Sequence, residues 1–133
     1  MQTFDLEGRQ LRLPEANLSF PQVLSLQDDP DGLRLRLEIV PALDCFRGHF
    51  PDEPVLPGVV QLHWAVLIAQ ARFDFPAVPT EIKRLKFKKI VTPPQELELT
   101  LSRRSATEVQ FSFDSPDGPN SEGRLVFAET AVC

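Results

Sequence analysis

Residues 48–73 read GHFPDEPVLPGVVQLHWAVLIAQARF, and this stretch decides how the rest of the chain can fold. Its second part is an apolar run over residues 58–73. The polar side chains in this run are Gln61, His63, Gln70 and Arg72. Pro57 suits a helix start, because its fixed backbone angle is helical and its missing N–H would be unpaired there. We therefore expect a helix over residues 58–73, roughly 24 Å long and largely buried.

Alternating apolar residues flank the predicted helix on both sides. Before it, PQVLSLQ and LRLRLEIV are separated by the turn sequence DDPDG, which predicts an antiparallel hairpin with one buried face. After it, four strand-like segments follow, with SRRSATE and DSPDGPN as turns; the segments are EIKRLKFKKIV, ELELTLSRR, VQFSFD and EGRLVFAET. We expect an α+β fold in which one antiparallel sheet wraps around a single buried helix. Residues 1–133 then form one domain, with a loosely patterned N-terminal segment over residues 1–19.

Composition narrows the class of protein. A chain of 133 residues fits one compact domain, and its formal charge of −5 argues against general nucleic-acid binding. The N-terminus lacks the pattern of a signal peptide, and no segment reaches the roughly 20 apolar residues of a membrane span. Cys45 and Cys133 fit neither a metal-ligand spacing nor a disulfide framework. We expect a cytoplasmic protein in which both cysteines are packing or incidental residues rather than reactive thiols.

The loop before the helix is stiff and contains one of the two histidines of the chain, His49; the other is His63. Pro51, Pro54 and Pro57 each fix a backbone angle and bias the preceding residue toward extended conformations. Gly58 opens the helix without a side chain to shield its free N–H groups, which favour a carbonyl oxygen that gains negative charge. These residues alone indicate a base beside an electrophile stabiliser.

The loop resembles that of the hot-dog-fold β-hydroxyacyl-acyl-carrier-protein dehydratases of fatty-acid synthesis. It carries Phe46 and then the G-H-F-P-x-x-P-x-x-P-G order over residues 48–58. A second similarity lies in RLKFKKIVTPPQELEL, where a basic and aromatic strand precedes V-x-P and the next strand. The continuation VVQLHW is most similar to the divergent, ApeI-like branch found in aryl polyene and related polyketide-like clusters.

The resemblance implies a partnership as well as a reaction. It implies a homodimer, or a dimer with a related chain, whose central helices lie side by side with acyl tunnels at the interface. The substrate would be a thioester on acyl carrier protein, held through a phosphopantetheine arm, with no metal or redox cofactor. A symmetric dimer also agrees with a sheet that has few strands and long edges.

Roles carry over to matching positions. His49 would remove the α-proton of the thioester, work that suits a neutral imidazole with a reference pKa of about 6.5. The Gly58 N–H would polarise the thioester carbonyl. We also expect substrate contacts from Phe50, Pro57, Val59 and Gln70, the last because it shares a helix face with His63.

His63 is the main departure from the family pattern. The family carries a glutamate or aspartate fourteen positions after the loop histidine, and here that position is His63. It could donate a proton to the departing hydroxyl, hold a water that does so, or mark an altered enzyme. A satisfied core histidine is the structural alternative. Asp44, Asp52 and Glu53 are loop carboxylates that could replace the missing acid if the loop folds toward the tunnel.

A basic run, KRLKFKK, stands out in an acidic chain, with Lys83, Arg84, Lys86, Lys88 and Lys89. It predicts either a solvated strand face or a docking site for acidic acyl carrier protein. Leu85 and Phe87 are expected to point the other way, into the core. Three functions compete for the whole chain: a dehydratase, which we favour; a hot-dog thioesterase; and a non-catalytic acyl-binding or scaffold subunit.

Overall fold

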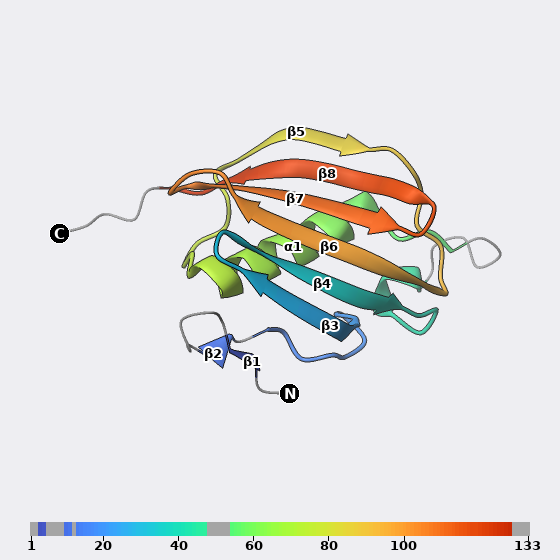
Figure 1. Ribbon diagram of the computed structural model, residues 1–133. Helices are drawn as coiled ribbons and strands as arrows, with labels where there is room; N and C mark the ends of the chain where they lie inside the picture. The colour runs from blue at the N-terminus through green and yellow to red at the C-terminus, as the bar shows by residue number, and fades with distance from the viewer. Residues whose placement is uncertain (1–2, 5–9, 12, 48–53, 129–133) are drawn as a thin grey trace.

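The structure, a computed structural model, describes residues 3–4, 10–11, 13–47 and 54–128 (Figure 1). Two short strands, β1 (Thr3–Phe4) and β2 (Gln10–Leu11), pair near the N-terminus. A 3-10 turn, η1, spans Asp44–Phe46, and the helix α1 spans Gly58–Phe73. The main sheet contains β3 (Gln22–Asp29), β4 (Gly32–Ile39), β5 (Glu81–Phe87), β6 (Gln95–Arg103), β7 (Glu108–Ser115) and β8 (Gly118–Val126).

The six strands lie in the order β3-β4-β6-β7-β8-β5, and each neighbouring pair is antiparallel. Helix α1 crosses one face of this sheet (Figure 1). The predicted architecture, an antiparallel sheet around one helix, is confirmed, and the predicted helix has the observed bounds. The edge strand β5 follows α1 in the chain but pairs with β8, the last strand. This crossover brings β5 into the site described below.

The core lies between the sheet and the helix. On β4, β6 and β7, every second side chain points inward and is almost fully buried, because successive side chains of a strand alternate between faces. Trp64 and Ile68 face these strands from α1 and are equally buried. The inward strand residues are Leu33, Leu35, Leu37, Ile39, Leu97, Leu99, Leu101, Val109, Phe111 and Phe113.

Burial of the helix is one-sided. Seven of its sixteen residues are buried, and they include the polar Gln61 and Arg72. Val59 is 72% exposed and His63 is also exposed. The sequence prediction of a largely buried helix therefore holds for the face that packs on the sheet, and a second face is open in the single chain. No helix within the described residues is long and apolar enough to cross a membrane.

Two sequence expectations need correction. The segment DSPDGPN was predicted to be a turn, but β8 begins at Gly118, because the turn at residues 115–118 is tight and Gly118 adopts a φ of 118°. Leu85 and Phe87 were expected in the core, but they are 39% and 51% exposed. Both lie on the edge strand β5, where no described strand covers the outer side.

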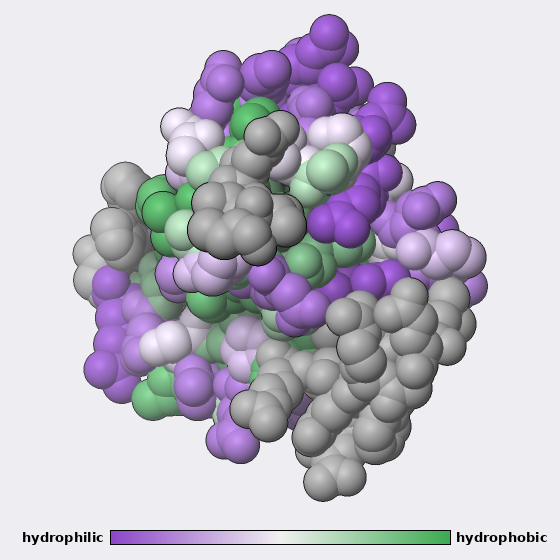
Figure 2. All heavy atoms as spheres, turned by 90° about the vertical axis from the view of Figure 1, so that its left-hand side faces the viewer, coloured by the Kyte–Doolittle hydropathy of each residue, from purple (hydrophilic) through white to green (hydrophobic). Residues whose placement is uncertain are grey.

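The C-terminal end of α1 is anchored to the sheet by cationic side chains. The Arg72 guanidinium donates a hydrogen bond to the Asp29 carbonyl oxygen at 2.9 Å. The Arg103 guanidinium lies over the rings of Phe73 and Phe75, at 5.0 and 5.5 Å from their centroids. Figure 2 shows this end of the molecule, where hydrophilic residues cover most of the surface and hydrophobic residues form smaller patches between them.

Candidate active site

Gly58 and Phe87 meet at the start of helix α1. A Cβ atom on Gly58 would lie 2.7 Å from two atoms of the Phe87 ring, closer than non-bonded carbon atoms approach. Glycine suits this position because any side chain would have to displace the Phe87 ring. The edge strand β5 thus supplies an aromatic wall directly beside the first turn of the helix.

A hollow of about 400 Å³ lies at this junction. Its walls are mainly apolar, and its charged lining residues are Lys88 and Lys89. The lining residues are Val55, Leu56, Pro57, Gly58, Gln61, Phe87, Lys88, Lys89 and Ile90. The structure therefore brings together four of the residues singled out from sequence: Pro57, Gly58, Lys88 and Lys89. An apolar hollow with a few polar groups is the usual form of a small-molecule site.

The backbone of the first helical turn aims a hydrogen-bond donor out of the helix. The Pro57 carbonyl oxygen accepts hydrogen bonds from the N–H groups of Val60 and Gln61, at 3.1 and 3.2 Å. Because C=O and N–H point in opposite directions across a trans peptide, the Gly58 N–H points away from the helix body. A carbonyl oxygen in front of this group would be met by both the donor and the positive end of the helix dipole.

His63 and Gln70 do not line this hollow. His63 lies on the exposed side of α1, on the same face as Val59 one turn earlier. Gln70 lies near the other end of the helix, where its side-chain amide donates to the Ala77 carbonyl oxygen at 3.1 Å. In the single chain, the predicted substrate contacts Val59 and Gln70 are therefore separated from each other along the helix.

The proposed base falls outside the described residues. Residues 48–53 lie outside the part of the chain that the structure describes, and they include His49, Phe50, Asp52 and Glu53. The described chain resumes at Pro54, and Leu56 is already fixed by a hydrogen bond from its N–H to the Val91 carbonyl oxygen at 2.8 Å.

The 3-10 turn η1 leads into the histidine loop. Asp44 accepts a hydrogen bond from the Ser19 hydroxyl at 3.4 Å and pairs with Arg47 at 3.5 Å, so its carboxylate already has partners within the described chain. Burial raises the pKa of the Cys45 thiol above its ordinary value. A raised thiol pKa lowers the thiolate fraction, which agrees with the prediction that Cys45 is a packing residue.

Side chains of the basic run line two separate hollows. Arg84 and Lys86 line a smaller hollow of about 130 Å³ together with Arg124 and Glu122. Arg84 has a φ of 53° and lies at the irregularity where β5 shifts register between Lys83 and Lys86.

Lys88 and Lys89 lie at the larger hollow, and each has a carboxylate partner. Lys88 Nζ lies 2.8 Å from Glu122, and Lys89 Nζ lies 3.8 Å from Asp117. The Lys88 hydrogen bond lowers the pKa of the Glu122 carboxyl. Part of the positive charge of the basic run is therefore balanced locally.

Two polar residues at this site escaped sequence reasoning. Gln61 is 3% exposed, and its side-chain oxygen accepts a hydrogen bond from the Ser121 hydroxyl at 2.7 Å. Gln61 had a visible signal, because it interrupts the apolar run of the helix on the face that packs against the sheet. Ser121 had none, since it follows a predicted turn and is sixty positions away in the chain.

Comparison with known proteins assigns the chain to a family. The model of the ApeI-like family, described as ApeI dehydratase, matches residues 25–124. The chain is 33% identical over 93 residues to the 3-hydroxyacyl-[acyl-carrier-protein] dehydratase FabZ of Natranaerobius thermophilus, covering 62% of this chain and 66% of that protein. It is 26% identical over 105 residues to FabZ of Rhodopseudomonas palustris, covering 72% and 69%. The chain thus spans about two thirds of the length of these relatives.

Among solved structures, one chain of the dehydratase heterocomplex ApeI:P from Xenorhabdus doucetiae superimposes with a TM-score of 0.75 at 28% identity. The match covers 82% of this chain and 98% of that one. The predicted resemblance to hot-dog dehydratases, including the narrower branch, is confirmed by these matches. The helix, the wrapped sheet and the loop motif are thus those of one group of enzymes, and this chain belongs to the ApeI-like dehydratase family.

Proposed function

We propose that the chain dehydrates a β-hydroxyacyl thioester on acyl carrier protein to the trans-2-enoyl thioester. The reaction would serve fatty-acid-like or polyene synthesis, aryl polyenes included, in the cytoplasm. Membership of the ApeI-like family and similarity to FabZ proteins support this reaction class. The observation that carries the proposal is that Gly58, the last residue of the G-H-F-P-x-x-P-x-x-P-G motif, opens helix α1 and lines an apolar hollow.

Each bond change has a candidate group. His49 takes the α-proton, and the electron pair of that C–H bond forms an enolate with the thioester carbonyl. Negative charge develops on the thioester oxygen, where the Gly58 N–H meets it. As the carbonyl forms again, the pair makes the new double bond between the α and β carbons and the bond from the β-carbon to oxygen breaks. The leaving hydroxyl takes a proton to depart as water. Phe50 and Pro57 would contact the acyl thioester near this point.

His63 is the candidate donor for the departing hydroxyl. It occupies the position at which the family pattern has a carboxylate, and it lies exposed on α1 near Val59. An imidazolium can give the proton directly, and a neutral imidazole can hold a water that gives it. A partner chain over this face would enclose His63 in an interface, together with Val59 and Gln70.

A second copy, or a related chain, is the proposed partner at the edge strand. The exposed apolar side chains near this edge are Val59, Leu85, Phe87 and Ile90. Within the described chain, β5 pairs on one side alone, with β8, so its outer backbone groups are available to another strand. The matching chain from Xenorhabdus doucetiae belongs to a dehydratase heterocomplex, which supports a heterodimer as the alternative to a homodimer.

Acyl carrier protein is the second proposed partner. Lys83, Arg84 and Lys86 form a basic strand segment on an acidic chain, and local positive charge speeds encounter with an acidic protein. Lys88 and Lys89 line the hollow, and they would exchange their carboxylate partners for the phosphate of the phosphopantetheine arm.

Mass spectrometry of a β-hydroxyacyl-acyl-carrier-protein incubated with the purified protein tests the proposal. We expect loss of one water from the acyl group, and His49→Ala should abolish that loss. Release of free acid would identify a thioesterase instead. An unchanged acyl group that stays bound to the protein would identify an acyl-binding or scaffold subunit.

A further inference from the structure

Leu56, two residues before Gly58, is held by hydrogen bonds on both of its backbone groups. Its N–H donates to the Val91 carbonyl oxygen at 2.8 Å, and its carbonyl oxygen accepts from the side-chain amide of Gln61 at 3.3 Å. Leu56 is 2% exposed, whereas Val55 and Pro57 on either side of it are partly exposed and line the hollow. Leu56 is therefore a fixed point immediately before the helix.

Gln61 is itself held from the sheet. Its side-chain oxygen accepts a hydrogen bond from the Ser121 hydroxyl at 2.7 Å, and Ser121 is 1% exposed. The two partners fix the orientation of the amide, because Leu56 offers an acceptor and Ser121 offers a donor. A buried amide and a buried hydroxyl stabilise a protein only while they remain bonded, so each side chain depends on the other.

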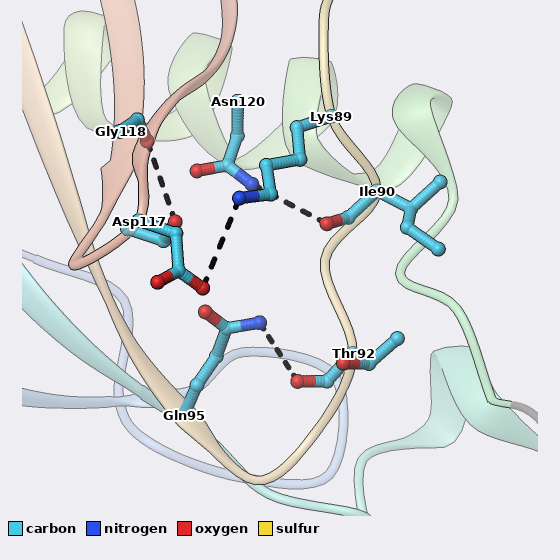
Figure 3. A network of polar contacts seen from close by, with 8 residues as sticks. Lys89, Ile90, Thr92, Gln95, Asp117, Gly118 and Asn120 are labelled. Atoms are coloured by element: carbon cyan, nitrogen blue, oxygen red, sulfur yellow. Dashed lines mark hydrogen bonds and ion pairs between the residues drawn. The ribbon is translucent and has the colours of Figure 1, made fainter.

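Asn120, the residue before Ser121, holds the segment that leads to Val91. The Asn120 side chain, 1% exposed, donates to the Ile90 carbonyl oxygen at 3.4 Å, and Figure 3 shows its amide directed at this carbonyl. Its backbone carbonyl oxygen accepts from the N–H groups of Lys88 and Lys89, at 2.7 and 3.2 Å. The loop that presents the Val91 carbonyl to Leu56 is thus attached to β8.

The contacts of Leu56 affect the orientation of Gly58 because Pro57 alone separates the two residues. Pro57 has no N–H, so the Leu56 carbonyl is the last backbone group before the Gly58 peptide that a side chain holds. On the helix side, the Pro57 carbonyl is fixed by Val60 and Gln61, which leaves the Gly58 N–H pointing out of the helix, at a residue that lines the hollow. A shift of Leu56 would rotate this peptide and redirect the donor.

We propose that Gln61 and Ser121 are positioning residues for the Gly58 N–H. They hold the backbone from Leu56 to Gly58 so that the donor is already aimed when charge develops on the thioester oxygen. This inference rests on the proposed function, in which that N–H polarises the carbonyl. Preorganisation of this kind lowers a barrier because no dipole has to reorient during the reaction.

Kinetics provide the first test. Gln61→Met keeps the length of the side chain and removes both hydrogen bonds, and Ser121→Ala removes the donor to Gln61. We expect each to lower kcat by about tenfold to a hundredfold with KM little changed. A misdirected Gly58 N–H would still allow the substrate to bind, but it would stabilise the transition state less. Ser121→Thr, which retains the hydroxyl, should restore most of kcat.

A matched control separates position from chemistry. The Thr80 hydroxyl donates to the Val126 carbonyl oxygen at 3.2 Å, just before β5 and at the opposite end of that strand from Phe87, so Thr80→Val removes a side-chain to backbone hydrogen bond away from Gly58. It should leave kcat within about twofold of the native value. A loss in Thr80→Val as large as that in Gln61→Met would overturn the inference.

Infrared difference spectroscopy tests the same point without turnover. The probe is butyryl-pantetheine labelled with ¹³C at the thioester carbonyl, which has no β-hydroxyl to lose. At saturation, the native protein should lower the carbonyl stretching frequency relative to water, and Gln61→Met and Ser121→Ala should reduce this shift. Native kcat and a native carbonyl shift in folded variants would overturn the inference. Loss of the shift in the variants would support it even if mass spectrometry found no dehydration.

Discussion

The guanidinium Nε of Arg72 lies 2.7 Å from the carboxylate of Asp28, and both side chains are more than nine-tenths buried. Arg72 belongs to the last turn of α1, and Asp28 belongs to β3 at the far edge of the sheet from β5. The helix is therefore attached at its C-terminal end by an ion pair and at its N-terminal end by the Gln61 hydrogen bonds.

Removal of one member of this ion pair should be costly. We expect Arg72→Met to lower the free energy of unfolding by about 3–5 kcal/mol, because it leaves the Asp28 carboxylate buried without its cation. The double change Arg72→Met, Asp28→Leu should recover much of the loss. Urea unfolding gives the comparison. Arg36→Met is the control, since its pair with Glu96 is about half exposed, and its effect should stay below about 1 kcal/mol.

Close packing at the helix start predicts a second result. Gly58→Ala should lower the free energy of unfolding by about 1–3 kcal/mol, because the new methyl group would overlap the Phe87 ring. In a Phe87→Ala background the same change should cost little, since the ring is gone. Thermal unfolding of the four proteins measures this coupling. Equal costs in both backgrounds would contradict the contact.

Because His63 is exposed, a substitution there can change activity without changing the stability of the single chain. We expect His63→Ala to change the free energy of unfolding of the single chain by less than about 0.5 kcal/mol. Dehydration should fall about a hundredfold or more if the imidazole takes part in proton transfer. His63→Glu should restore turnover if the position acts as an acid. Native turnover in His63→Ala would make the residue structural.

Acid should weaken the contact between Lys88 and Glu122 in a defined direction. The hydrogen bond from Lys88 lowers the pKa of Glu122 below its ordinary value of 4.5, so the folded state binds fewer protons than the unfolded state in mild acid. Stability from this pair is complete above that value and is lost as the pH falls through the lower folded pKa. Lys88→Met should flatten the pH dependence there, by less than about 1 kcal/mol because the pair is partly exposed. Unfolding curves between pH 3 and pH 6 check it, on the scale where carboxyl groups titrate.

Several features of this protein follow from short-range patterns in its sequence. The helix over 58–73 was predicted with the observed bounds, because Pro57 marks its start and the apolar run fills a single length of helix. Strands β4, β6 and β7 were predicted from period-two alternation, since each buries one face against the helix. The loop motif identified the dehydratase family, which the comparisons confirmed.

Other features depend on the order of strands in the sheet, which local patterns do not contain. Leu85 and Phe87 were expected in the core because they alternate with the basic side chains of the run KRLKFKK. The fold places β5 at an edge, where both side chains are exposed beside the helix start. A side chain is buried only when another element covers it, and that element can lie anywhere in the chain.

The sequence by itself determined the helix, most strands of the main sheet, the family and the candidate pair of histidines. These features depend on neighbouring residues and on their spacing along the chain. Tertiary structure alone decided that Phe87 would press against Gly58 and that Ser121 would hold Gln61 from sixty positions away. Such contacts form because packing the sheet on the helix leaves buried polar groups that must find partners. The partners are set by three-dimensional distance rather than by separation along the chain.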